Sequence, residues 1–322
     1  MSVAPVTQSM SNQDDYTAET HSTLDIETSH TLSRVRAALV RFWAGFKYSS
    51  SYIAVSAMVE VAIAMVLLGV SLNPAPLVVG LVMFSVYTND RIADVETDAI
   101  SDPEKAAFIT RYEHLLEPLA DAAYGLAVML AIAGGPLALL LTFFPGVFWI
   151  FYASGWLDAF DGALFRLKSV LVLNTTVVAL AWAIVLTLLP VAFANAPLSP
   201  AVFLAFAYFF LRVFTFVELS NIPDVDGDRQ IGVDTIPVVF GIDGTRRALY
   251  LLNGLTAAVV LSALLSGGIL SLPVAGVLLL ATAYSLAVAA LVGRWGNISA
   301  LIQAAEAEYF LTYLALLAVL AA

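Results

Sequence analysis

Long apolar stretches alternate with short polar connections along most of the chain. A helix needs roughly 20 apolar residues to cross the hydrocarbon core of a bilayer. By this criterion, nine stretches within residues 50–322 predict membrane spans. They cover approximately 50–72, 74–92, 118–133, 135–155, 169–190, 199–220, 247–266, 271–292 and 304–321. The pattern predicts an all-α, polytopic membrane protein whose transmembrane domain is a bundle of about nine helices.

The distribution of basic residues supports this count and gives the bundle an orientation. Connections on the cytoplasmic side of a membrane are enriched in Lys and Arg. If the N-terminus is cytoplasmic, the outer connections hold no Lys or Arg at all. The cytoplasmic connections then hold Arg91, Lys105, Arg111, Arg166, Lys168, Arg229, Arg246, Arg247 and Arg294. The sequence therefore predicts a multi-pass protein of the cell membrane with a cytoplasmic N-terminus.

Two segments precede the predicted spans. Residues 1–33 are acidic, contain no Lys or Arg and lack the apolar region of a secretory signal, which predicts a disordered cytoplasmic tail. Residues 34–49 mix basic side chains with Phe42 and Trp43, which predicts an interfacial amphipathic helix.

Composition narrows the classes of function. The chain is 61% hydrophobic with a mean hydropathy of +0.90, well above a typical soluble domain. The net charge of -11 argues against nucleic-acid binding and against a basic lipid-binding surface, and it fits a salt-rich cytoplasm. There are no cysteines, which excludes disulfides and thiolate chemistry.

A repeated acidic motif is the strongest candidate for chemistry. Asp90, Asp94 and Asp98 close the second predicted span at a spacing of i, i+4 and i+8, which places them on one face of a helix. Asp224 and Asp228 follow the sixth span at the same helical spacing. Stacked carboxylates repel one another unless a cation lies between them, and Mg²⁺ commonly bridges carboxylates to phosphates. Two such clusters on one side of the membrane would bind a diphosphate through metal ions.

Other interpretations of the acidic clusters are weaker. Solvated acidic loops explain one cluster but not two, each closing an apolar span. A polytopic transporter is the main alternative function, although transporter sites are expected near the bilayer midplane rather than at its cytoplasmic edge. A membrane phosphotransferase of the CDP-alcohol type would show a single D-G-x-x-A-R cluster, which is not reproduced.

The motifs lie four spans apart, which suggests two related four-helix units plus a ninth helix.

Both motifs resemble those of the UbiA superfamily of intramembrane prenyltransferases. Residues 90–103, DRIADVETDAISDP, resemble its first aspartate-rich motif. Residues 221–241, NIPDVDGDRQIGVDTIPVVFG, are similar to its second motif and the tail that follows. The sequence RLK at 166–168 resembles the family's basic element. The chain departs from the family pattern where Asp90 replaces an Asn, Asn221 replaces an Asp and Pro103-Glu104-Lys105 replaces an Arg-Pro element.

The resemblance implies a mechanism and a set of site residues. The family's metal is Mg²⁺, and its partners are a prenyl diphosphate donor, a hydrophobic acceptor and the lipid bilayer. Six residues would hold the metal, the aspartates also being catalytic: Asp90, Asp94, Asp98, Asn221, Asp224 and Asp228. Eight would contact the substrates: Asn89, Asn221, Arg229, Lys168, Lys105, Asn174, Tyr152 and Arg212. Family acceptors include quinone precursors, ether-lipid glycerol phosphates and carotenoids.

Two further features have more than one interpretation. Arg212 and Glu60 each lie about 13 Å deep at roughly 1.5 Å per residue, so we expect Arg212 to pair with Glu60 or with another buried acid, or to bind the acceptor. Residues 221–246 are rich in Gly and predict a long cytoplasmic loop that closes over the diphosphate. Aromatic faces such as Phe84, Tyr87 and Tyr152 are candidates to stabilise an allylic cation or simply to pack.

Overall fold

The structure is a computed structural model that describes residue 1 and residues 34–40, 42–153, 171 and 173–322. Its two compact units, residues 1–47 and 48–322, are considered separately. In the first unit the described residues 34–40 and 42–47 are helical. The rings of Phe42 and Trp43 lie 6.2 and 6.0 Å from that of Phe46, so this helix carries a cluster of aromatic side chains.

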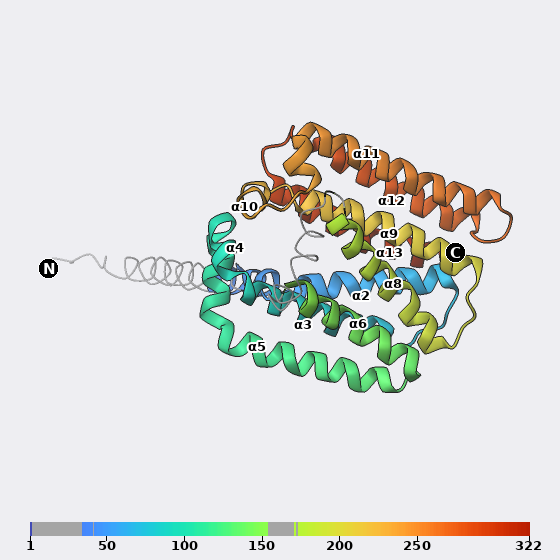
Figure 1. Ribbon diagram of the computed structural model, residues 1–322, viewed down its shortest axis with the longest axis horizontal. Helices are drawn as coiled ribbons and strands as arrows, with labels where there is room; N and C mark the ends of the chain where they lie inside the picture. The colour runs from blue at the N-terminus through green and yellow to red at the C-terminus, as the bar shows by residue number, and fades with distance from the viewer. Residues whose placement is uncertain (2–33, 41, 154–170, 172) are drawn as a thin grey trace. The chain divides into compact units, whose positions relative to one another are not determined.

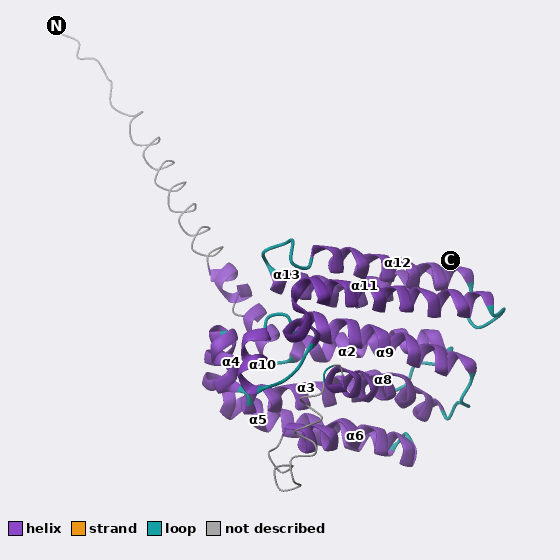
Figure 2. Cartoon of the chain, turned by 45° about the horizontal axis from the view of Figure 1, so that its top comes forward, coloured by secondary structure: helices purple, strands orange, loops and turns teal. Residues whose placement is uncertain are grey.

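The second unit is helical throughout, and no strand occurs among its described residues. Its long helices run along one another, with α11 and α12 on one side and α5 on the other (Figures 1 and 2). The elements are α2 Ser51–Leu68, α3 Ala75–Ala93, α4 Val95–Ser101, α5 Pro103–Ile132, α6 Gly135–Ala153, α8 Leu173–Ala194, α9 Pro200–Ser220, α10 Val225–Ile231, α11 Ile236–Leu265, α12 Leu272–Leu291 and α13 Ile298–Ala321.

The helices confirm a polytopic membrane protein. Within the described residues, seven are long and apolar enough to cross a bilayer, namely α2, α5, α8, α9, α11, α12 and α13. The two remaining predicted spans coincide with α3, whose last turn contains the start of the first acidic motif, and α6, whose apolar part is shorter.

Two predicted boundaries are wrong. The third span was expected at 118–133, but α5 already begins at Pro103, because Asp102 caps it by accepting a hydrogen bond from the Lys105 backbone N–H at 3.0 Å. The predicted loop 221–246 is largely helical, since it contains α10 and the start of α11. Its glycines interrupt the helices instead of forming a loop: Gly232 ends α10 at φ 74°, and Gly241 kinks α11 at φ 65°.

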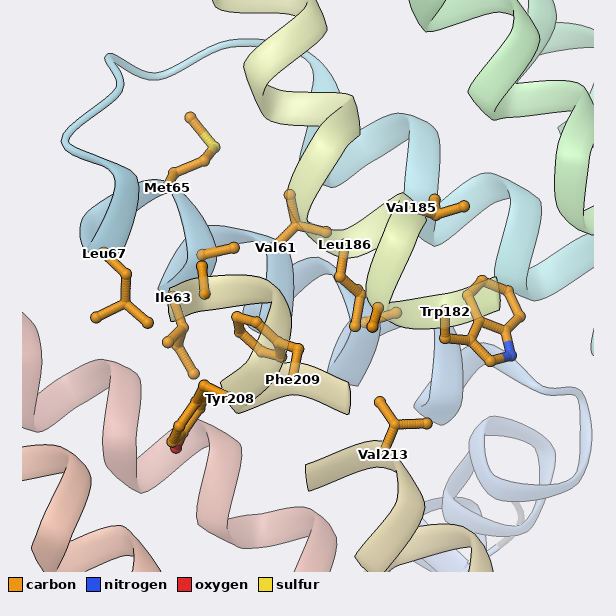
Figure 3. Packing of buried hydrophobic residues seen from close by; sticks show 14 of the residues in the cluster. Val61, Ile63, Met65, Leu67, Trp182, Val185, Leu186, Tyr208, Phe209 and Val213 are labelled. Atoms are coloured by element: carbon orange, nitrogen blue, oxygen red, sulfur yellow. The ribbon is translucent and has the colours of Figure 1, made fainter. Parts of the chain in front are cut away.

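The core lies where α2, α8 and α9 contact one another (Figure 3). Phe209 of α9 is fully buried and packs in one cluster with Ile63 of α2 and Leu186 of α8. Small residues allow close approach of the helices, as is usual in membrane bundles. At Gly80 of α3, a Cβ atom would lie 2.5 Å from the Cγ of Met58 in α2, so any larger residue there would force the Met58 side chain to move.

The bundle also buries an ion pair. Arg212 of α9 donates from Nη2 to both carboxylate oxygens of Glu308 in α13 at 2.6 Å, and from Nη1 to Oδ1 of Asn253 in α11 at 3.1 Å. The two charged side chains are only 3% and 2% exposed. Pairing of Arg212 with Glu60 is therefore not what the structure shows; the partner is another buried acid. Glu60 lies nearby, buried within α2 and within electrostatic range of Arg212.

This ion pair generates a stability prediction. Glu308→Met leaves the buried guanidinium without its counter-ion, which usually costs about 3–5 kcal/mol, so we expect a clear fall in the thermal unfolding midpoint in detergent. The double variant Arg212→Met/Glu308→Met removes both charges and should recover much of that loss. The exposed Glu117 on α5 provides a control, Glu117→Met, expected to leave the midpoint unchanged. A double variant no more stable than Glu308→Met would contradict the ion-pair account.

Candidate active site

The first acidic motif spans the junction of α3 and α4. Asp94 lies between the two helices with non-helical backbone angles, yet the helical hydrogen bonds continue through it. The Asp94 N–H donates to the Asp90 carbonyl at 2.9 Å, and the Asp98 N–H donates to the Asp94 carbonyl at 2.8 Å. Because these hydrogen bonds keep the helical spacing, successive aspartates lie about one turn apart along the chain.

The second motif connects α9 to α11 through the short helix α10. Asp224 occupies the position before α10, and the Asp228 N–H donates to the Asp224 carbonyl at 2.8 Å. These two aspartates therefore lie one helical turn apart. Asp226 is out of phase with them, 89% exposed, and forms a 3.4 Å ion pair with Arg229.

The two motifs meet at one end of the bundle. Helices α4 and α10 contact each other there, and both views place them together (Figures 1 and 2). Lys105, in the first turn of α5, forms a 2.8 Å ion pair with Asp98 of the first motif. Partial burial raises the pKa of Asp224 in the second motif, the Lys105 charge lowers it and the Asp98 charge raises it. One group from each motif and one ammonium therefore form a single electrostatic cluster.

Asp228 is the most perturbed carboxyl of this cluster. Burial and the neighbouring Asp224 charge raise its pKa to about 6, and a hydrogen bond from Thr235 at 3.5 Å partly opposes the shift. Near neutral pH the ionised carboxylates of Asp224 and Asp228 in the second motif therefore repel each other. Such a site favours the binding of a cation.

Glu218 supports the second motif and was missed by the sequence analysis. It lies one turn before Asn221, is 0% exposed, and accepts hydrogen bonds from the Thr175 hydroxyl at 2.6 Å and the Ile236 N–H at 3.3 Å. It therefore joins α9, α8 and the start of α11, the helix that follows the second motif. An acid inside an otherwise apolar span was the available signal.

Arg91, which occupies the position of an Asp in the family's first motif, belongs to this end of the bundle. Its Nη1 donates to the Tyr48 carbonyl at 2.7 Å, and its charge interacts with Asp98 and Asp90. It thus supplies a second positive charge to the first motif.

The other predicted substrate residues are distributed unevenly. Asn89 donates to the Ser85 carbonyl at 3.1 Å and lies beside the first motif. Arg229 is 60% exposed on α10, while Arg212 belongs to the buried ion pair in the bundle interior. Lys168 lies outside the described residues, and the side chains of Tyr152 and Asn174 are not described although their helices are.

The residues present fit a magnesium ion, although they do not form a closed cage. Among the described His, Asp and Glu residues, no group of three converges tightly enough to hold a metal alone. Mg²⁺ usually keeps several waters and is held by one or two carboxylates together with substrate phosphates, so a closed protein cage is not required. The available donors are oxygen atoms that repel one another across α4 and α10, which suits a hard divalent cation.

Comparison with known proteins decides the family. The sequence profile described as the UbiA prenyltransferase family matches residues 62–314. The chain belongs to this family. The match contains both acidic motifs.

Solved structures of UbiA homologues share the fold. One from Archaeoglobus fulgidus, bound to GPP and Mg²⁺, is 17% identical, with 85% of this chain and 100% of that chain covered and a TM-score of 0.59. The apo structure from Aeropyrum pernix K1 is 16% identical, with 82% and 96% covered and a TM-score of 0.63. A digeranylgeranylglyceryl phosphate synthase is 14% identical, with 84% and 97% covered and a TM-score of 0.54. No curated protein sequence matches this UbiA-family chain.

The hydrogen bonds of Glu218 predict that Glu218→Gln destabilises the second motif. The Thr175 hydroxyl, the Ile236 N–H and the Asn221 side chain all donate to the carboxylate, and the glutamine amide offers only one acceptor oxygen. At least one buried donor therefore loses its bond, at a cost of roughly 1–3 kcal/mol. We expect a lower thermal unfolding midpoint and faster proteolysis within residues 221–235. Glu113→Gln, on the exposed surface of α5, is the control. Unchanged proteolysis in Glu218→Gln would show that Glu218 does not anchor this segment.

The raised pKa of Asp228 predicts a pH dependence of metal-free stability. A carboxyl whose folded pKa, about 6, exceeds its ordinary value of 3.8 stabilises the fold when protonated, and this contribution is lost as the pH rises through 6. In EDTA, the unfolding midpoint of the natural chain should therefore fall relative to Asp228→Asn between about pH 4 and pH 7. Parallel midpoint curves for the two proteins would contradict the raised pKa.

Proposed function

We propose that this UbiA-family protein transfers a prenyl group from a prenyl diphosphate to a hydrophobic acceptor within the membrane, with Mg²⁺ as the metal. The observation that carries this proposal is the meeting of the two aspartate motifs, which join Asp98, Lys105 and Asp224 in one cluster. The neighbouring fold bound to GPP and Mg²⁺ supports the same donor and metal.

The residues divide into metal ligands and diphosphate contacts. We assign the metal to Asp90, Asp94, Asp98, Asn221, Asp224 and Asp228, all of which offer oxygen atoms. Lys105, Arg229 and Asn89 lie at the same end and would contact the diphosphate, with Lys168 as a further prediction. When bound, Mg²⁺ neutralises the negative charge that grows on the departing diphosphate.

The bundle interior suits the cation that remains after diphosphate leaves. Tyr87 lies one turn deeper than Asp90 on α3, and its ring stacks on buried Trp182 of α8 with 6.1 Å between centroids. Aromatic faces stabilise cations, and an apolar surrounding keeps water from capturing them. The donor chain would therefore extend from the acidic cluster past Tyr87 into the bundle.

The acceptor is proposed as a hydrophobic molecule that arrives from the lipid phase. Quinone precursors, ether-lipid glycerol phosphates and carotenoids all meet this description. One neighbouring fold is a digeranylgeranylglyceryl phosphate synthase, which supports the ether-lipid class. Tyr152 and Asn174 remain predicted substrate contacts, whereas the guanidinium of Arg212 is engaged by Glu308 and Asn253.

The orientation is also a proposal. The distribution of Lys and Arg favours a cytoplasmic N-terminus and a cytoplasmic active site. We further propose that residues 34–49 lie in the membrane interface, because Phe42 and Trp43 are exposed beside Arg34 and Arg36.

Purified protein in detergent, supplied with geranylgeranyl diphosphate and a panel of acceptors, tests this function directly. We expect Mg²⁺-dependent diphosphate release and prenylated product, both abolished by EDTA and reduced at least about 100-fold in Asp94→Ala and Asp224→Ala, because charge stabilisation of the leaving group is lost. Glu117→Ala is the control for altered charge, and intact thermal unfolding of each variant excludes misfolding.

Metal-dependent binding without turnover would mean that the acceptor or chain length is wrong. Absence of both binding and turnover in the natural chain would contradict the proposed activity and favour the transporter interpretation.

A further inference from the structure

The ammonium of Lys105 lies where the two aspartate motifs approach each other. Its Nζ is 2.8 Å from Oδ2 of Asp98, and the two side chains are only 22% and 19% exposed. Its charge also favours the ionised form of Asp224 on the opposite motif, against the effects of burial and of Asp98. One flexible cation therefore offsets the repulsion between carboxylates that come from distant parts of the chain.

The position of Lys105 combines a fixed backbone with a movable head group. Its backbone N–H is bound by the Asp102 side chain at 3.0 Å, which fixes the residue in the first turn of α5. The side chain has a flexible four-carbon stem and a compact charge. Rotation about its bonds can therefore move the ammonium while the helix stays in place. Tyr48 donates to the neighbouring Glu104 at 3.3 Å and ties the same turn of α5 to the start of the bundle.

A metal ion and this ammonium need the same carboxylate. Asp98 belongs to the proposed magnesium ligands, and an oxygen engaged by an ammonium at 2.8 Å must release it before coordinating a metal. We infer that Lys105 is a placeholder cation: it neutralises the Asp98–Asp224 cluster in the metal-free protein, is displaced when metal enters, and then contacts the diphosphate. This inference rests on the proposed function.

The placeholder role predicts effects of opposite sign from one substitution. Lys105→Met keeps the length of the side chain and removes its charge. Metal binding without diphosphate should become tighter, by about two- to five-fold, because the competing ion pair, whose worth is modest when partly exposed, is gone. Metal-free stability should fall, because the carboxylates repel without a counter-ion. Binding of a diphosphate in the presence of metal should weaken, because a positive contact is lost.

The experiment measures Mn²⁺ binding by electron paramagnetic resonance, thermal unfolding in EDTA, and binding of geranyl diphosphate with Mg²⁺. It compares the natural chain with Lys105→Met, Lys105→Arg and the matched control Arg111→Met, an exposed cation of the same helix. We expect Lys105→Met alone to bind Mn²⁺ more tightly, to unfold at lower temperature in EDTA and to regain stability with Mn²⁺.

Each outcome decides the matter. Unchanged or weaker Mn²⁺ binding in Lys105→Met overturns the placeholder role but leaves the proposed function standing. A diphosphate contact alone would weaken geranyl diphosphate binding without altering Mn²⁺ binding or metal-free stability, and that result also overturns it. Failure of the natural chain and every variant to bind Mn²⁺ without diphosphate overturns the placeholder role. The proposed function falls only if binding of geranyl diphosphate by the natural chain is also independent of Mg²⁺.

Discussion

Repulsion between carboxylates at one end of the bundle is the constraint on which the site depends. Asp98 and Asp224 come from parts of the chain more than a hundred residues apart, and the Asp98 charge still raises the pKa of Asp224. A fold that brings like charges together needs rigid support and a source of positive charge. The continuous hydrogen bonds from Asp90 through Asp98 and the anchor formed by Glu218 supply the support, while Lys105 and Arg91 supply the charge.

Helix α9 links this site to the interior of the membrane domain. It carries Phe209 in the core, Arg212 in the buried ion pair and Glu218 just before the second motif. Arg212 joins α9 to α13 and α11, and Glu218 joins it to α8 and the start of α11. The second motif is therefore held in position by the buried polar contacts of α9, which are strong because they are shielded from water.

Much of this arrangement could be predicted from the sequence because it follows from local pattern. The apolar stretches gave the bundle, and the spacing of Asp90, Asp94 and Asp98 gave their separation of about one helical turn. The start of α5 was misplaced because its first turns are polar, and an apolar window cannot detect a helix that extends beyond the membrane. The segment after Asn221 was predicted as a loop because its glycines were interpreted as breakers, whereas Gly227 lies within α10.

The pairings could not be predicted, because they depend on which helices are neighbours. The sequence offered several buried acids to Arg212, and only the packing of α9 against α13 selects Glu308 over Glu60. Likewise, the link of Lys105 to Asp98 requires α5 to turn back beside α4. Local periodicity contains no information on such contacts.

The central claim is that the two motifs act as one metal-dependent diphosphate site. A double-mutant cycle tests it most directly: Asp98→Asn, Asp224→Asn and the double variant, each measured for Mg²⁺-dependent binding of geranyl diphosphate. Groups that share ligands give non-additive losses, so the account predicts that the double variant binds far better than the product of the two single losses implies. Strictly additive losses would show that the motifs act independently and would contradict it.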